Sequence, residues 1–116
     1  MQDFNIKQGE TWATGITVCQ SNGTTPQDLT GATVTGAVRL QPSDAIIAKM
    51  TCTIPDAKAG MIVCELSKTD TAKIPASSSY VKSRDYYYDI LLTQEDGVAV
   101  YLSSGMMHVF GGVQIG

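Results

Sequence analysis

Apolar and polar residues alternate along most of this chain. In one such run, Val34, Val38 and Leu40 alternate with Thr35 and Arg39. Successive side chains of an extended strand point to opposite faces, so a period of two gathers the apolar residues on one face. The pattern therefore predicts half-buried β-strands.

Runs of this kind predict about eight strands. They lie near Phe4 and Ile6 and at residues 11–19, 33–40, 50–54, 62–66, 86–93, 98–102 and 107–113. Turn-forming residues separate them, including Asp96-Gly97 and, before the last strand, Ser103-Ser104-Gly105. Short strands at close intervals without intervening long helices indicate antiparallel pairing. We expect an all-β fold, an antiparallel immunoglobulin-like β-sandwich.

One segment departs from the alternation. Ser67 has a hydroxyl that can cap a helix start, and Pro75 prevents extension beyond Ile74. We therefore expect one short helical turn that bridges the two sheets. The residues expected between the sheets are Trp12, Ile16, Val34, Val38, Leu66, Tyr88, Ile90 and Leu92.

The composition favours one folded domain over residues 1–116. The chain is 43% hydrophobic, and a chain of this length can bury about two-thirds of its unfolded surface. No run approaches the ~18 apolar residues of a membrane span, and the N-terminus lacks the basic and apolar regions of a signal peptide. We expect a protein made in the cytosol, with no membrane partner.

The charge balance argues against nucleic acid as a partner. Eight Lys and Arg against eleven Asp and Glu give a net charge of −3, whereas phosphate contacts require clustered cations. The glycines form no loop that leads into a helix, so we expect no nucleotide and no other cofactor.

Three cysteines do not predict a metal site. The spacing of Cys19, Cys52 and Cys64 matches no zinc pattern. Cys52 and Cys64 lie on the two arms of an expected hairpin and could face each other across it. They are then either small buried apolar residues or a disulfide, and a reducing cytosol favours the first.

The chain also shows no catalytic motif. Its one histidine, His108, lies in an apolar run without a serine or cysteine nucleophile beside it, so a structural role is favoured. Among the tyrosines of residues 86–88, alternation directs Tyr86 and Tyr88 inward and Tyr87 outward. We expect no catalytic residues.

The C-terminal strand is apolar on both faces. Met106, His108 and Phe110 share one face, and Met107 and Val109 share the other. An outer strand of a monomeric sandwich should have one wet face, so something is expected to cover this one. The cover is either a loop or the N-terminal segment that contains Phe4 and Ile6, or else it is another subunit.

Several segments together resemble small β-sandwich proteins of tailed bacteriophages and prophages, in particular the N-terminal domain of upper baseplate proteins. These segments are residues 4–11, the turn 27–31 with the strand ending in Val38-Arg39-Leu40, residues 66–72, and Tyr87-Tyr88-Asp89-Ile90. The resemblance implies a virion structural protein without catalytic residues. Since the chain stops soon after its last strand, a head-decoration, neck, collar or tail-associated subunit is expected rather than a fibre.

These observations favour a non-enzymatic protein that docks on a larger symmetric assembly. The expected partners are other virion proteins and further copies of the chain, and the expected location is the virion, after synthesis in the host bacterial cytoplasm. The expected contact residues are Tyr87, Met106, His108 and Phe110. The alternative is a carbohydrate- or surface-binding β-sandwich.

Overall fold

The computed structural model describes residues 3–20, 23–41, 45–75 and 83–111. Apart from one short helix, its regular elements are all β-strands. They are β1 (Phe4–Lys7), β2 (Trp12–Thr17), β3 (Thr33–Arg39), β4 (Ala48–Asp56), β5 (Met61–Leu66), α1 (Lys68–Lys73), β6 (Arg84–Thr93) and β7 (Ala99–Phe110).

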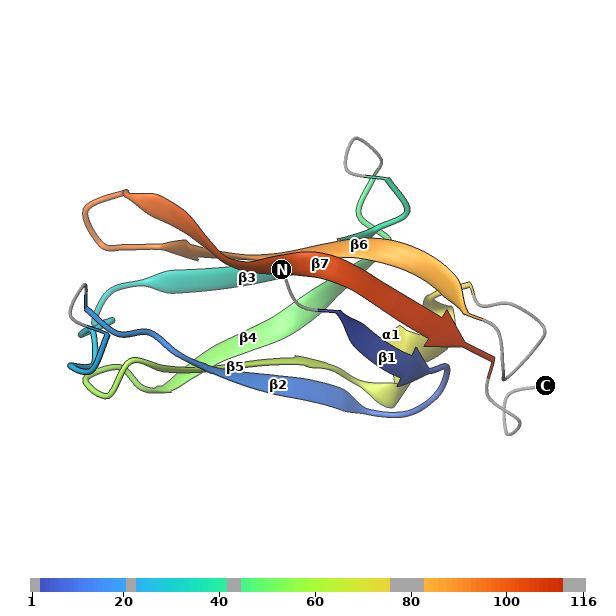
Figure 1. Cartoon of the computed structure of the whole chain (residues 1–116), viewed down its shortest axis with the longest axis horizontal. Coiled ribbons are helices and arrows are strands. Elements are labelled where there is room, and N and C mark those ends of the chain that lie inside the picture. Colours follow the sequence, from blue (N-terminus) through green and yellow to red (C-terminus); the bar gives the residue numbers. More distant parts are fainter. Residues whose placement is uncertain (1–2, 21–22, 42–44, 76–82, 112–116) are drawn as a thin grey trace.

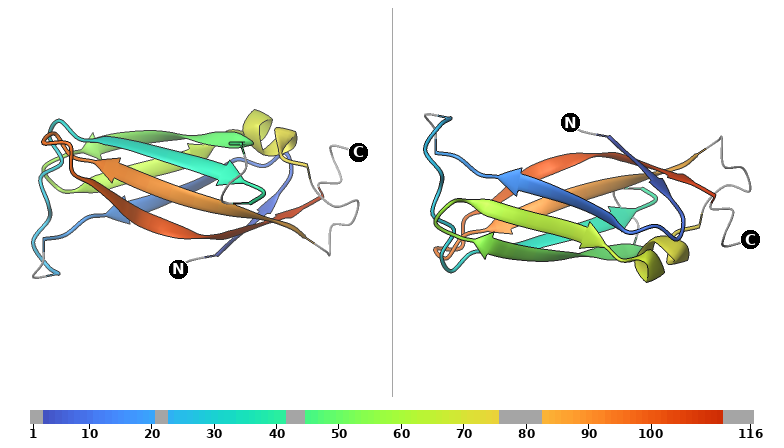
Figure 2. Two further views of the ribbon diagram at one scale, coloured as in Figure 1. Left: turned by 90° about the horizontal axis from the view of Figure 1, so that it is seen from above. Right: turned by 90° about the horizontal axis from the view of Figure 1, so that it is seen from below.

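The strands form one sheet in the order β1-β7-β6-β3-β4-β5-β2. The sheet turns over on itself, so that β3, β6 and β7 form one layer and β2 and β5 the other (Figures 1 and 2). Strand β4 joins the layers because Ala48 and Met50 pair with β3, whereas Thr51 and Asp56 pair with β5. A single strand therefore belongs to both layers.

The expected strand count is wrong by one over the described residues. The two strands expected at 98–102 and 107–113 are the single strand β7, although residues 112 and 113 lie outside the described part. The expected turn at Ser103-Ser104-Gly105 is instead paired with β6. Its residues remain extended because Ser103 contacts the hydroxyl of Tyr88 at 3.0 Å and because long-range pairing outweighs local turn preference.

The expectation of purely antiparallel pairing is also wrong. Strand β1 runs parallel to β7, with Phe4 opposite Met107 and Lys7 opposite Phe110. All other neighbouring strands are antiparallel. A parallel pair needs a connection that crosses over rather than a tight hairpin, and here the chain leaves β1 for the opposite layer to form β2.

The core lies between the layers. Five of the residues expected there are buried and three are partly buried. The buried ones are Val38, Leu66, Tyr88, Ile90 and Leu92, and the partly buried ones are Trp12, Ile16 and Val34. Burial of one aliphatic side chain such as Ile90 contributes about 2 kcal/mol.

Helix α1 occupies the expected place and anchors the turn between β1 and β2. Its cap is Ser67, whose hydroxyl accepts a hydrogen bond from the amide of Asp70 at 3.1 Å. The fully buried Thr71 donates its hydroxyl to the carbonyl of Glu10 at 2.7 Å and accepts from the amide of Gly9 at 3.1 Å. These bonds fix the end of β1 and thereby the N-terminal strand beside β7.

Candidate assembly interface

The four expected contact residues lie on one face of the β6–β7 pair. Tyr87 of β6 is directly opposite Met106 of β7, and paired residues of an antiparallel ladder share a face. His108 and Phe110 continue this row along β7. We call these four residues the outer face. Tyr87 is 40% exposed and the other three are half-buried.

The N-terminal segment lies beside β7 and does not cover the outer face. Phe4 and Ile6 point inward, since Ile6 is fully buried and the Phe4 ring packs 4.9 Å from Trp12 and 5.3 Å from Tyr88. Their sequence neighbours Asn5 and Lys7 are exposed. The expectation that the segment with Phe4 and Ile6 covers this face is therefore wrong for residues 4–7.

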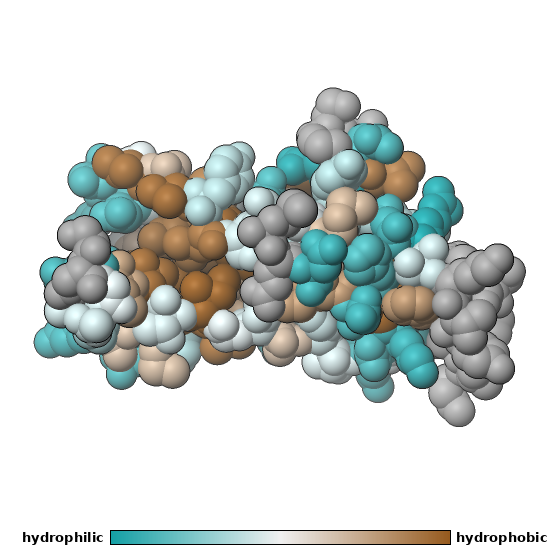
Figure 3. Space-filling model, in the orientation of Figure 1, coloured by the Kyte–Doolittle hydropathy of each residue, from teal (hydrophilic) through white to brown (hydrophobic). Residues whose placement is uncertain are grey.

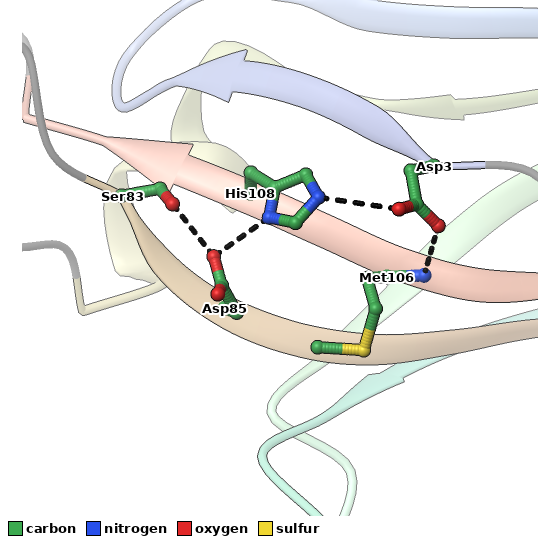
Figure 4. A network of polar contacts seen from close by, with 5 residues as sticks. All are labelled: Asp3, Ser83, Asp85, Met106 and His108. Carbon is green, nitrogen blue, oxygen red and sulfur yellow. Dashed lines mark hydrogen bonds and ion pairs between the residues drawn. The ribbon is translucent and has the colours of Figure 1, made fainter.

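A polar network crosses the outer face and links β6, β7 and the residue before β1 (Figure 4). Nδ1 of His108 lies 2.7 Å from Oδ1 of Asp85, and its Nε2 lies 3.4 Å from Oδ2 of Asp3. Ser83 donates its hydroxyl to the same Asp85 oxygen at 2.6 Å. The amide of Met106 donates to Oδ1 of Asp3 at 3.1 Å. The network thus ties the residue before β1 to β7, and β7 to β6.

The charges of this network favour a protonated histidine. The hydrogen bond to Asp85 raises the pKa of His108; burial opposes this rise, and the Asp3 carboxylate adds to it. The hydrogen bond from Ser83, followed by that from His108, lowers the pKa of Asp85. An imidazole flanked by two carboxylates therefore lies within an otherwise apolar row.

The contacts in this network differ from those of a catalytic triad. In a triad the serine hydroxyl bonds to the histidine, which is oriented by the carboxylate. Here Ser83 donates to Asp85, and both ring nitrogens of His108 contact carboxylates. His108 thus has no ring nitrogen turned toward Ser83 to accept its proton.

One pocket among the described residues adjoins the end of the outer face. It has a volume of about 340 Å³ and is lined by Asn5, Ile6, Lys7, Glu10 and Phe110. Within the described ranges, no group of three or more His, Cys, Asp or Glu could hold a metal ion. No helix among those residues is long and apolar enough to cross a membrane.

The cysteines lie apart from the outer face. Cys52 and Cys64 are directly opposite each other on β4 and β5, as the hairpin allowed, and all three thiols are free. Burial raises the pKa of Cys64 to about 12 and raises that of Cys52 as well. Cys64 therefore behaves as a small buried apolar residue.

Sequence reasoning found the outer face but missed the carboxylates that flank His108. Asp85 could have been found, because it precedes the inward-pointing Tyr86 by one residue and so belongs on the same face as Tyr87. Asp3 lies 105 residues from His108. Nothing in the local pattern predicted that β1 pairs with β7.

Comparison with known proteins gives similarity to solved structures alone. No protein-family model matches the chain, and no curated protein matches it. Among solved structures, it is similar to the structure of murine CRIg, with 11% sequence identity over 95% of this chain and 92% of that chain, and a TM-score of 0.39. A similarity at this TM-score assigns neither family nor function.

Proposed function

We propose that this chain is a non-enzymatic structural protein of bacteriophage virions, a head-decoration, neck, collar, tail or baseplate-associated module. The observation that carries the proposal is the outer face: Tyr87, Met106 and Phe110 leave apolar surface on one side of two adjacent strands. Apolar and aromatic side chains of this kind are enriched where proteins associate. The resemblance of several segments to phage proteins supplies the setting.

We further infer that the fold is an immunoglobulin-like sandwich. In such folds a tyrosine near the start of the sixth strand bonds back to the main chain upstream. Here Tyr86, the third residue of β6, donates its hydroxyl to the carbonyl of Pro75, just beyond α1. The two layers joined through β4 fit the same architecture.

On this proposal the partners are other virion proteins, together with further copies of the chain in a symmetric assembly. The chain is made in the cytoplasm of the host bacterium and resides in the virion. Docking buries Met106 and Phe110 and retains the charge of His108 at the centre of the contact. A partner that carries a carboxylate or a carbonyl opposite His108 would complement it.

The test uses particles from a host strain in which the gene for this chain is deleted and then supplied in trans. We expect the wild-type chain in purified particles by mass spectrometry. Met106→Asp places a charge on the outer face and should abolish incorporation. Thr53→Asp, on an exposed position of β4, is the matched control and should be incorporated normally.

Circular dichroism of both purified variants separates loss of docking from loss of folding. The proposal fails if the wild-type chain is absent from particles, or if a folded Met106→Asp chain is incorporated as well as the control.

One observation favours the alternative, a carbohydrate- or surface-binding module. Tyr101 is 65% exposed and lies opposite Leu91, which puts it on the same face as Tyr87. The two positions are four residues apart along β6, about 13 Å at the usual rise of a strand. Glycan-array binding that is lost in both Tyr87→Ala and Tyr101→Ala would favour this function over virion assembly.

A further inference from the structure

Strand β2 ends the sheet and exposes one row of backbone groups. It pairs with β5 on one side only. The amide of Val18, next to the strand end, donates to the carbonyl of Gly60 at 2.8 Å. Since donors and acceptors of an antiparallel strand alternate between its two sides, Ala13, Gly15 and Thr17 direct their N–H and C=O groups to the free edge.

This edge lacks the features that keep sheet edges from pairing. Natural edge strands carry charged residues, prolines or bulges. The six residues of β2, Trp-Ala-Thr-Gly-Ile-Thr, include neither a charge nor a proline. Their register with β5 is continuous over all six pairs, so no bulge twists the edge away.

The core is also open beside this edge. Thr14 and Ile16 point inward but remain half-buried, although their partners Cys64 and Ile62 on β5 are at most 1% exposed. The inward-pointing side chains of β2 are therefore less buried than their partners on β5, because β2 is the last strand of the sheet.

Strand β7 lies across this open part of the core from β2, and it too carries a core-facing side chain that is more exposed than its partner. Val100 is opposite Leu92 and shares its face, yet Leu92 is 2% exposed and Val100 is 45% exposed. A pocket of about 240 Å³ lies between the two strands, lined by residues of β1, β2, β6 and β7 that include Ile16, Leu102 and Ser103. In Figure 3, apolar surface gathers over the left half of the molecule, where β7 begins in Figure 1.

We propose that a second copy of this chain pairs its β2 antiparallel with β2 across a two-fold axis. In the register that pairs all three residues whose backbone groups face the free edge, Gly15 lies opposite Gly15 and Ala13 lies opposite Thr17. The sequence of β2 suits this occupant, because an uncharged strand brings no like charges together when it meets its own copy. The contact is isologous, so it closes as a dimer.

The same pairing accounts for the open core. The partner strand adds to the layer of β2 and β5 at its free edge and lies across the mouth of the pocket. It covers Thr14 and Ile16 from the side that none of the described strands occupies. This contact is separate from the outer face and does not depend on the proposed virion role.

Charged substitutions at Gly15 test the pairing. A Cβ at this position meets only the Ile62 carbonyl, at 3.9 Å, so Gly15→Lys and Gly15→Glu each fit without strain. Each variant alone places two like charges directly opposite each other, whereas an equimolar mixture places opposite charges there. Thr53→Lys, on an exposed position within the sheet, is the control.

Light scattering after size exclusion gives the mass of each species, against 12.3 kDa for one chain. We expect twice this mass for the wild type and for Thr53→Lys, the single-chain mass for either Gly15 variant alone, and twice the mass again for the mixture. A wild-type monomer at high concentration overturns the proposal. So does a dimer that either Gly15 variant leaves intact, or a mixture that stays monomeric while both variants are folded.

Discussion

Asp85 Oδ1 lies 2.7 Å from Nδ1 of His108 across the β6–β7 pair. This contact holds the pKa of His108 above its ordinary 6.5 and contributes to holding that of Asp85 below its ordinary 3.8. The protonated histidine stabilises the fold fully below pH 6.5 and loses this effect as pH rises through its raised pKa. The ionised aspartate contributes above pH 3.8 and loses its effect as pH falls through its lowered pKa.

We therefore expect the free energy of unfolding to fall between about pH 6 and about pH 9 by up to about 1 kcal/mol, a small value because these side chains are 27% and 47% exposed. Urea unfolding of the wild type and of His108→Gln at the two pH values measures it. The fall should be smaller in His108→Gln. An equal fall in both proteins would assign the pH dependence to other groups.

Replacing Tyr86 with Phe should destabilise the chain. The change removes the hydroxyl that bonds to the Pro75 carbonyl while it retains a ring that is 1% exposed. The loss of one such hydrogen bond lowers the free energy of unfolding by about 1–2 kcal/mol. Tyr87→Phe, at an exposed position on the same strand, is the control and should change it by less than about 0.5 kcal/mol. Equal midpoints in urea for the two variants would contradict this role of the hydroxyl.

Gly60→Ala should be more harmful than Gly97→Ala. Both glycines have positive φ angles, 68° and 91°, so each alanine is strained by about 1–2 kcal/mol. At Gly60 the added methyl also meets the carbonyl oxygens of Val18 and Gln27, whereas at Gly97 nothing lies within 4 Å. Crowding of this kind costs about 1–3 kcal/mol more.

Thermal unfolding of the two glycine variants gives the comparison directly. If Gly97→Ala lowers the melting temperature as much as Gly60→Ala does, then the backbone conformation alone accounts for both effects, and the close approach at Gly60 is energetically unimportant.

The three thiols should react with iodoacetamide in a fixed order. Cys19 is exposed and should be alkylated first. Cys52 is half-buried with a raised pKa, and Cys64 is fully buried with a pKa of about 12, so these should follow in that order. Mass spectrometry of timed samples of the folded chain measures the rates. Alkylation of Cys64 at the rate of Cys19 would contradict its burial.

The sequence predicted those parts of the fold that depend on local chemistry. Alternation located the strands because each buries one face, and Val38, Leu66 and Ile90 lie in the core as expected. The Ser67 cap and Pro75 located α1 because helix ends need a partner for their amides and a stop.

The parts that it did not predict depend on contacts between distant residues. Ser103-Ser104-Gly105 has the local preference of a turn, but pairing with β6 keeps it extended. The direction of β1 relative to β7 leaves no trace in the alternation, since a strand buries the same face in either direction. The outer face was predicted from alternation, whereas the Asp3 contact to His108 follows only from that parallel pairing.

The parallel arrangement of β1 and β7 has a mechanical consequence. One strand lies at the N-terminal end of the described chain and the other at its C-terminal end, and they are paired over four residues. Tension that pulls those two ends apart slides the strands past each other, so the inter-strand hydrogen bonds stretch together instead of opening one at a time. A subunit that transmits force through its ends would resist extension at this pair first.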